Sequence, residues 1–287
     1  MFPVFTEQDG QNAFSRIERL VALGPRDSGT AGAAYAAQWI AQELRQIGLV
    51  PVADTWQEET AQGLKTFINV YAEIPGSEDG LIIIGSHFDT KSGISPDFIG
   101  ANDGGSSTGL ALELARVLKD AALKHTIRFA FFDGEECVEN YRINDGLHGS
   151  RRMAEQVATT RPKSLPVPVV IVLDMVGQKN LRLIIPRNVT PKLALLALKS
   201  AEAIGYTPLK IAAGSILDDH WSFLEQGMPS LLLIDFDYGD VPGKNNYWHT
   251  VHDTLDKLSP ESLTITGRIT LGMIQRLEQE PLDNTPR

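Results

Sequence analysis

Two adjacent carboxylates, Glu135 and Glu136, follow a short apolar and aromatic run at residues 127–132. The run is too short and too rich in β-forming residues for a helix, so we expect a buried strand, with Gly134 turning the chain after it. Carboxylates packed side by side repel one another, and a fold that holds them at the edge of its core usually supplies a cation or a proton for them to share. A solvated turn would also explain the pair, so its chemistry depends on the residues around it.

Other residues of the kinds that bind metal ions follow predicted strands or precede a predicted helix. They are His87, Asp103, Asp174 and His249. In open α/β sheets, ligands bind beyond the carboxyl ends of the strands, so we expect these groups and the acidic pair at one edge of the sheet. Such nitrogen and oxygen ligands suit a catalytic zinc ion, which takes three protein ligands and leaves one position open. Helix capping would also explain Asp103. No short-spaced motif such as HExxH is present, so the metal site rests on this spatial inference.

The elements that must position these residues alternate between strands and helices. Strands are expected at 50–56, 66–74, 81–85, 127–132, 167–173, 181–185 and 230–234, and helices at 11–23, 31–47, 106–118, 147–157, 191–204 and 260–277, with a short helix within 217–229. This alternation indicates a three-layer α/β/α sandwich with a mixed, largely parallel central sheet, in a single domain over residues 1–287. Residues 75–80, PGSEDG, predict a hairpin-like connection, and the polar loop 235–248 predicts a site-forming segment.

The composition limits the partners of the chain. A formal net charge of −10 argues against nucleic acid or an anionic membrane surface, because either would be repelled, and a neutral or cationic substrate fits better. Cys137 is the single cysteine, so no internal disulfide can form, and we expect a packed thiol there. Neither a signal-peptide-like stretch nor a membrane-spanning apolar run is present. These features favour the cytoplasm, although a chain trimmed of a leader would look the same.

Several residues near these motifs have simpler explanations. Arg26 lies in the polar turn GPRDSGT and is expected on a surface loop. His125 directly precedes a predicted strand and is expected to be solvated. His252 and Asp253 lie close to His249 in the sequence, and we expect them to orient that ligand.

A series of short motifs carries a resemblance to a known family. In chain order the motifs are GSHFDT, GANDGGSS, FFDGEE, LHGSRRMAE, LDMVG, LDDHWSFLEQGMP and WHTVHDT. This series resembles the zinc-dependent aminopeptidase superfamily, and within it the animal-type glutaminyl-peptide cyclotransferases, or glutaminyl cyclases. The disulfide of animal members is absent here because the chain has one cysteine. The resemblance implies a single α/β/α domain with the metal at the carboxyl ends of the sheet.

The resemblance also implies a metal site and its catalytic neighbour. The cyclase zinc ligands match Asp103, Glu136 and His249. The general acid/base of the cyclases matches Glu135, the first residue of the acidic pair. One zinc ion per chain is therefore expected.

Four further residues match the surroundings of that site. Two carboxylates of the cyclase hydrogen-bond network match Asp174 and Asp218. The aromatic wall of the substrate pocket matches Trp248, and a second tryptophan, expected after the acidic pair, is replaced by Tyr141. The implied activity converts the N-terminal glutamine of peptides or proteins to pyroglutamate and releases ammonia.

Two other functions remain open at the level of the sequence. A two-zinc aminopeptidase would use the same scaffold to activate water, with His87 and Asp174 completing a second metal site bridged by Asp103. Asp218 and Trp248 favour the cyclase, because aminopeptidases more often carry serine and tyrosine at the matching positions. A non-catalytic domain that lost the chemistry is the other alternative, and the intact set of candidate ligands argues against it.

Overall fold

Eight strands form one mixed sheet within residues 2–142 and 144–279, which are the residues that the computed structural model describes. The order across the sheet is β1-β2-β4-β3-β5-β8-β6-β7. The strands are β1 (Val52–Thr60), β2 (Gly63–Ile74), β3 (Glu78–His87), β4 (His125–Phe132), β5 (Val169–Asp174), β6 (Ile184–Ile185), β7 (Lys210–Ile211) and β8 (Ser230–Ile234). The central four, β4, β3, β5 and β8, are mutually parallel. The predicted mixed, largely parallel sheet is thus confirmed.

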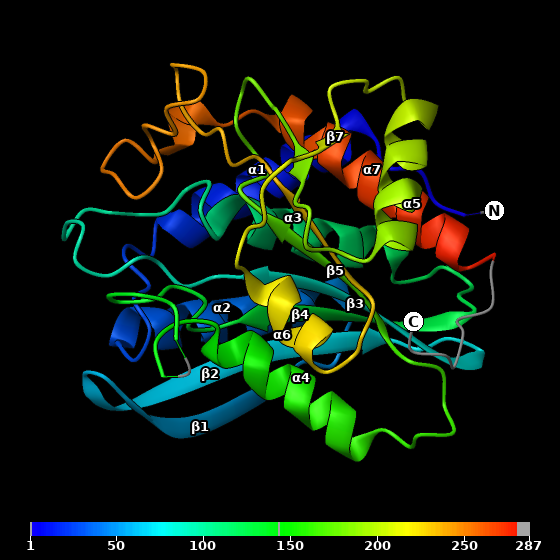
Figure 1. The fold of residues 1–287 in the computed structure, drawn as a ribbon, viewed down its shortest axis with the longest axis horizontal. Helices are drawn as coiled ribbons and strands as arrows, with labels where there is room; N and C mark the ends of the chain where they lie inside the picture. Colours follow the sequence, from blue (N-terminus) through cyan, green and yellow to red (C-terminus); the bar gives the residue numbers. More distant parts are fainter. Residues whose placement is uncertain (1, 143, 280–287) are drawn as a thin grey trace.

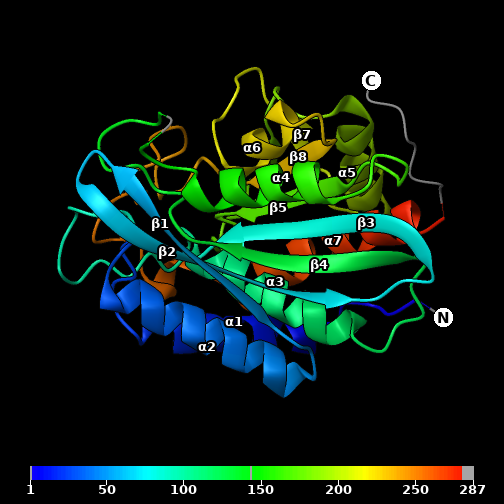
Figure 2. The ribbon, with the colours of Figure 1, turned by 90° about the horizontal axis from the view of Figure 1, so that it is seen from below.

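Helices cover both faces of this sheet (Figures 1 and 2). One layer consists of α1 (Glu7–Val21), α2 (Ala31–Ile47), α3 (Gly105–Leu118), α5 (Pro191–Ala203) and α7 (Pro260–Leu277). The other layer consists of α4 (His148–Thr160) and α6 (Asp219–Glu225), which cross in front of the sheet in Figure 1. A short 3-10 helix, η1 (Leu255–Lys257), precedes α7. None of the helices in the described ranges combines the length and apolar character needed to cross a membrane.

Two hydrophobic cores lie between these layers. In β3, Ile82 and Ile84 pack into the core under the larger helical layer, whereas Leu81 and Ile83 pack under α4 and α6. Successive side chains of a strand point to opposite faces, so a strand covered on both faces must be apolar throughout. This explains the continuous apolar runs in the sequence.

The connection at residues 75–80 is not the predicted hairpin. The hairpin lies earlier, between β1 and β2, where Thr60 pairs with Gly63. Strand β4 inserts between β2 and β3 and pairs with both. The backbone N–H groups of Ser77 and Glu78 donate to carbonyls of the segment just before β4, so long-range pairing decides this connection.

The strand register brings chemically active residues to one edge of the sheet. His87, the last residue of β3, pairs with Phe132 at the end of β4. Asp174, the last residue of β5, pairs with Ile234 at the end of β8. From β3 the chain places β4 on one side and β5 on the other, which makes the boundary between β3 and β5 a switch point of the kind where open α/β sheets bind ligands.

Two predictions about exposure were wrong. Arg26 has an exposed fraction of 0%, because its guanidinium donates to the carbonyl oxygens of Phe88, Ile99 and Gly100 and so closes the loop that follows β3. Burial lowers the pKa of Arg26 to about 10, which still leaves the side chain charged at neutral pH. His125 is also buried, and its imidazole packs against Gly80, where a Cβ atom would lie 2.2 Å from Nδ1.

Replacing Arg26 tests whether this buried cation supports the fold. We expect Arg26→Met to lower the free energy of unfolding of the metal-free protein by about 3 kcal/mol, because three buried carbonyl groups lose their donors. Urea unfolding would measure the change, with Arg45→Met as the control, since Arg45 is exposed at the end of α2. Equal stability of the two variants would contradict this role.

Candidate metal centre and active site

The acidic pair Glu135–Glu136 is held through its backbone. After β4 ends, the N–H groups of Glu135 and Glu136 donate to the two carboxylate oxygens of Asp89, at 3.1 and 3.2 Å. Asp89 is fully buried and comes two residues after His87. This role of Asp89 was missed at the level of the sequence. Its position in the GSHFDT motif was the available signal.

Asp103, Glu136 and His249 form a cluster that could hold a metal ion. His249 Nε2 lies 3.0 Å from Glu136 Oε1 and 3.3 Å from Asp103 Oδ2. The buried Oε2 atom of Glu136 has no hydrogen-bond partner among the described residues. Burial, together with the charge of Asp103, raises the pKa of Glu136 to about 7. Lys91 Nζ lies 4.0 Å from Glu136 Oε2, beyond hydrogen-bond distance. Two buried carboxylates and one imidazole whose atoms converge in this way fit a zinc ion.

A second cluster shares one residue with the first. His87 Nε2 lies 3.2 Å from Asp174 Oδ1 and 3.3 Å from Asp103 Oδ1. Asp103 therefore offers one carboxylate oxygen to each cluster. Burial lowers the pKa of His87, but contacts with Asp103 and Asp174 outweigh this and leave it well above its ordinary value. The geometry allows either a second metal ion or a hydrogen-bonded histidine at this place.

All eight residues predicted to form the site line one cavity of about 260 Å³. They are Asp103, Glu135, Glu136, Tyr141, Asp174, Asp218, Trp248 and His249. Phe236 and Leu217 add apolar surface to the same cavity. The structure therefore brings together residues that are up to 146 positions apart in the sequence, from Asp103 to His249.

Glu135, Asp174 and Asp218 are buried carboxylates of this cavity outside the first metal cluster. Burial and the neighbouring carboxylates, above all Glu136, keep the pKa of Glu135 well above its usual value. Burial and Asp174 do the same for Asp218, which also caps α6 by accepting from the N–H of Asp219 at 2.6 Å. These carboxylates are suited to holding and exchanging protons.

Aromatic rings line the cavity, and two residues beside it have strained backbone conformations. Trp248 stacks on the imidazole of His249, with ring centroids 4.0 Å apart, and Phe236 meets the indole edge-on at 5.1 Å. His249 has a φ of 54° and Met175, directly after Asp174, a φ of 44°. Left-handed conformations of such residues cost free energy and tend to occur at functional sites.

Asp253 contacts the candidate ligand Asp103, whereas a contact with His249 was expected. Its buried carboxylate accepts from the N–H groups of Asn102 and Asp103 at 2.7 and 3.1 Å, and from the Tyr238 hydroxyl at 2.7 Å. It therefore positions the backbone of Asp103. The prediction that Asp253 orients His249 was therefore wrong, because its carboxylate contacts Asn102, Asp103 and Tyr238 instead. His252 is exposed.

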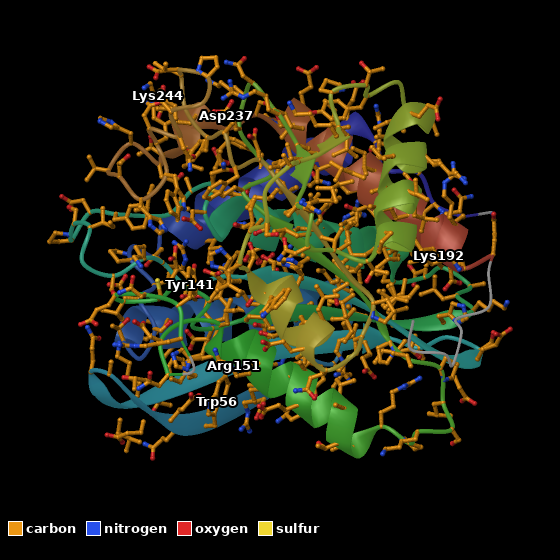
Figure 3. The ribbon with its side chains drawn as sticks, viewed as in Figure 1. Trp56, Tyr141, Arg151, Lys192, Asp237 and Lys244 are labelled. Atoms are coloured by element: carbon orange, nitrogen blue, oxygen red, sulfur yellow. The ribbon has the colours of Figure 1, made fainter. Side chains whose placement is uncertain are left out.

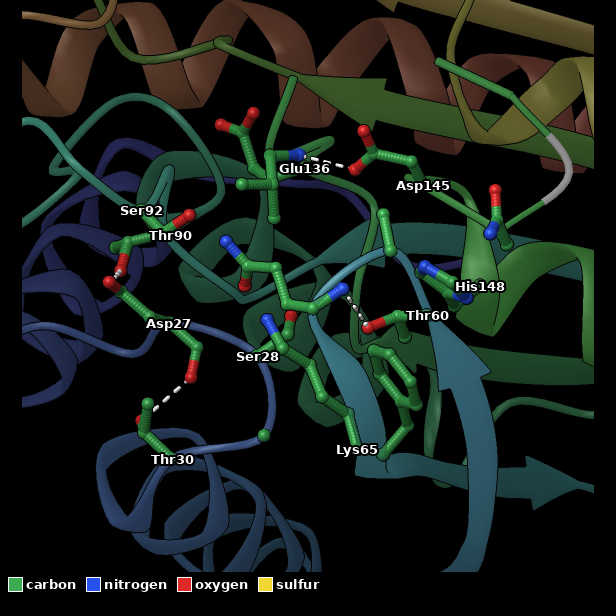
Figure 4. A pocket seen from close by; sticks show the side chains of 16 residues that line it. Asp27, Ser28, Thr30, Thr60, Lys65, Thr90, Ser92, Glu136, Asp145 and His148 are labelled. Carbon is green, nitrogen blue, oxygen red and sulfur yellow. Dashed lines mark hydrogen bonds between the residues drawn. The ribbon is translucent and has the colours of Figure 1, made fainter. Parts of the chain in front are cut away.

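A larger cavity, of about 340 Å³, adjoins the site on the other side of Glu136 (Figure 4). Its lining includes Lys65, Ser28 and Gln62 from the segments around the β1–β2 hairpin and the start of α2. His148 also lines it, with Nδ1 3.1 Å from Glu58 Oε1. Apart from Glu136, none of the eight predicted site residues lines this cavity, so the predicted residues converge on the smaller one.

Comparison with known proteins places this site in a family. A model of peptidase family M28 matches residues 69–274. The glutaminyl-peptide cyclotransferase of Boiga dendrophila is 27% identical over 303 residues, covering 92% of this chain and 80% of that protein. The crystal structure of an Acidobacteriales bacterium glutaminyl cyclase is 31% identical, with a TM-score of 0.87 over 96% of both chains. Porphyromonas gingivalis glutaminyl cyclase is 25% identical, with a TM-score of 0.83 over 96% of this chain and 99% of that one. The chain therefore belongs to peptidase family M28, and glutaminyl cyclases are among its homologues.

Proposed function

We propose that this protein is a zinc-dependent glutaminyl-peptide cyclotransferase, which converts the N-terminal glutamine of peptides to pyroglutamate and releases ammonia. The observation that carries the proposal is a non-ligand carboxylate, Glu135, beside the metal cluster and in the same cavity. The similarity to glutaminyl cyclases over nearly the whole chain supports it. The animal-type assignment stays a prediction, because bacterial enzymes match at least as well.

Asp103, Glu136 and His249 would hold the zinc ion. When bound, zinc would supply Lewis-acid polarisation of the side-chain amide carbonyl of the substrate glutamine. The acidic cavity attracts the positively charged α-amino group of the peptide. Trp248 offers a flat apolar face against which a small side chain can pack.

Glu135 moves the proton in this mechanism. After its ammonium form has released one proton to solvent, the neutral α-amino nitrogen attacks the γ-amide carbon, a C–N bond of the five-membered ring forms, and the bond to the amide nitrogen breaks. Glu135 takes a proton from the attacking amine and delivers it to the departing ammonia, so no water is consumed. Asp174 and Asp218 line the same cavity and would keep this proton path ordered.

A two-zinc aminopeptidase is the second candidate, and one observation favours it. His87, Asp103 and Asp174 form a second cluster of metal-ligand type, bridged to the first by Asp103. With two metal ions bound, water would be the nucleophile and Glu135 its general base. The names of the similar proteins described above favour the cyclase.

The two activities are separated by their products. We expect the zinc-loaded protein to release ammonia from a Gln-initiated dipeptide and to leave a leucine anilide intact, because intramolecular cyclisation needs a glutamine side chain. Coupled ammonia assays and anilide absorbance on the same sample would measure both. Anilide hydrolysis without ammonia release would instead establish the aminopeptidase.

Replacing Glu135 tests the proton-transfer step. We expect Glu135→Gln to retain zinc and to lower kcat by roughly a thousandfold, since the amide keeps the shape of the side chain but cannot accept the amine proton. Metal analysis and steady-state rates on the same preparation would check this. A variant that turned over at a near-normal rate would remove Glu135 from the mechanism.

The metal count distinguishes the two clusters. We expect one tightly held zinc per chain, lost in His249→Ala and retained in His87→Ala, because only the first cluster holds the ion in a cyclase. Elemental analysis after dialysis would measure it. His252→Ala is the matched control, since this exposed histidine lies three residues from His249. Two zinc ions per chain, with one lost in His87→Ala, would favour the aminopeptidase.

A further inference from the structure

Tyr141 makes a contact that an aromatic wall does not require. Its hydroxyl donates to the Glu135 carboxylate, with Oη 3.1 Å from Oε1 and 3.2 Å from Oε2. In the described part of the chain, no other side chain donates a hydrogen bond to that carboxylate within these distances. The resemblance predicts a tryptophan at this place, and an indole has no hydroxyl to offer.

The loop that carries Tyr141 is built to seat this ring. Gly146 has a φ of 89°, and a Cβ atom there would lie 2.6 Å from Cδ1 of Tyr141. The same Cβ atom would lie 3.0 Å from the carbonyl oxygen of Glu135, so glycine lets the ring, the loop and the catalytic segment approach one another. The N–H of Leu147 also donates to that carbonyl, at 3.0 Å.

The start of the loop is held by a buried carboxylate. Asp145 accepts hydrogen bonds from the backbone N–H groups of Val138, Glu139 and Asn140. At the far end, Arg151 in α4 donates to the carbonyl oxygen of Gly146 at 2.9 Å, and Figure 3 shows Tyr141 and Arg151 on the same side of the molecule. The loop backbone that carries the ring is therefore held by contacts that do not involve the Tyr141 hydroxyl.

We propose that Tyr141 is a positioning residue, whose hydroxyl fixes the orientation of the Glu135 carboxylate for proton transfer. This inference rests on the proposed function. A single hydroxyl proton shared between two carboxylate oxygens restrains rotation of the carboxylate plane, and hydrogen bonds to charged groups are among the stronger ones in proteins. Burial and the charge of Glu135 raise the pKa of Tyr141 well above its usual value, so the hydroxyl keeps the proton that it donates.

The Tyr141→Phe variant removes one oxygen atom and keeps the ring. In the zinc-loaded protein we expect kcat for ammonia release to fall roughly tenfold and KM to change by less than about twofold, because the hydrogen bond is lost and the apolar wall remains. Tyr35→Phe is the control, since Tyr35 is 60% exposed on α2 and should leave both constants unchanged.

An unchanged kcat in Tyr141→Phe, or a rise in KM alone, would overturn the proposal and leave Tyr141 as part of the wall. Zinc content should equal that of the wild type, and a variant that lost zinc would also contradict a role confined to Glu135.

A second measurement does not depend on activity or zinc. Urea unfolding of the metal-free wild type, Tyr141→Phe, Glu135→Leu and the double variant forms a double-mutant cycle, in which leucine, unlike glutamine, leaves no oxygen to accept the hydrogen bond. We expect the two changes to be non-additive, because each removes one partner of the same hydrogen bond. Additive effects would show that the contact is absent in solution. If the wild type released no ammonia, the proposed function would fail, whereas this cycle would still report on the contact.

Discussion

The crowding of buried carboxylates at one sheet edge is the constraint on which the rest of the structure depends. These carboxylates are Asp89, Asp103, Glu135, Glu136, Asp174, Asp218 and Asp253. A carboxylate is ionised in water at neutral pH, and several ionised carboxylates held together in a low-dielectric site repel one another. The fold places Arg26, His87 and His249 among them, and a dication fits the remaining deficit at Glu136. Without these cations, repulsion between the carboxylates would oppose the close approach of the loops that carry them.

The sheet accounts for this convergence through its register. His87 and Phe132 end β3 and β4 level with one another, and Asp174 and Ile234 do the same for β5 and β8. Residues that follow these strands therefore emerge within a small area, although they are far apart in the sequence. The apolar runs behind them bury both faces of the sheet and fix that register, since a slip of one residue would move every side chain to the opposite face. The packing of the core therefore also fixes the geometry of the site.

Much of this was predictable, and the failures have a physical pattern. Apolar periodicity located the longer strands and helices but not the two-residue strand β7 or the helix η1. Groups at strand ends indicated the edge of the sheet where the cavity lies, and the family resemblance added Tyr141, Asp218 and Trp248. Arg26 and the 75–80 connection were wrong because their environments depend on contacts with segments far away in the sequence: the carbonyls after β3 for Arg26, and the insertion of β4 for the connection. Asp89 and the contact of Asp253 were missed for the same reason, since a side chain that binds distant backbone N–H groups leaves no periodic trace.

Asp89 and Asp253 act in the same way: each carboxylate binds the backbone of residues whose side chains line the cavity. Asp89 accepts the N–H groups of Glu135 and Glu136, and Asp253 accepts those of Asn102 and Asp103. Asp145 does the same for the start of the loop that carries the aromatic wall. In each case an aspartate pairs with backbone donors, which are buried for Asp89 and Asp253, and it fixes the backbone without using the side chains that line the cavity. The carboxylates of Asp103, Glu135 and Glu136 thereby take no part in holding this backbone. Because Asp253 and His249 belong to one loop, the segment that carries one candidate metal ligand also holds the backbone of another, Asp103.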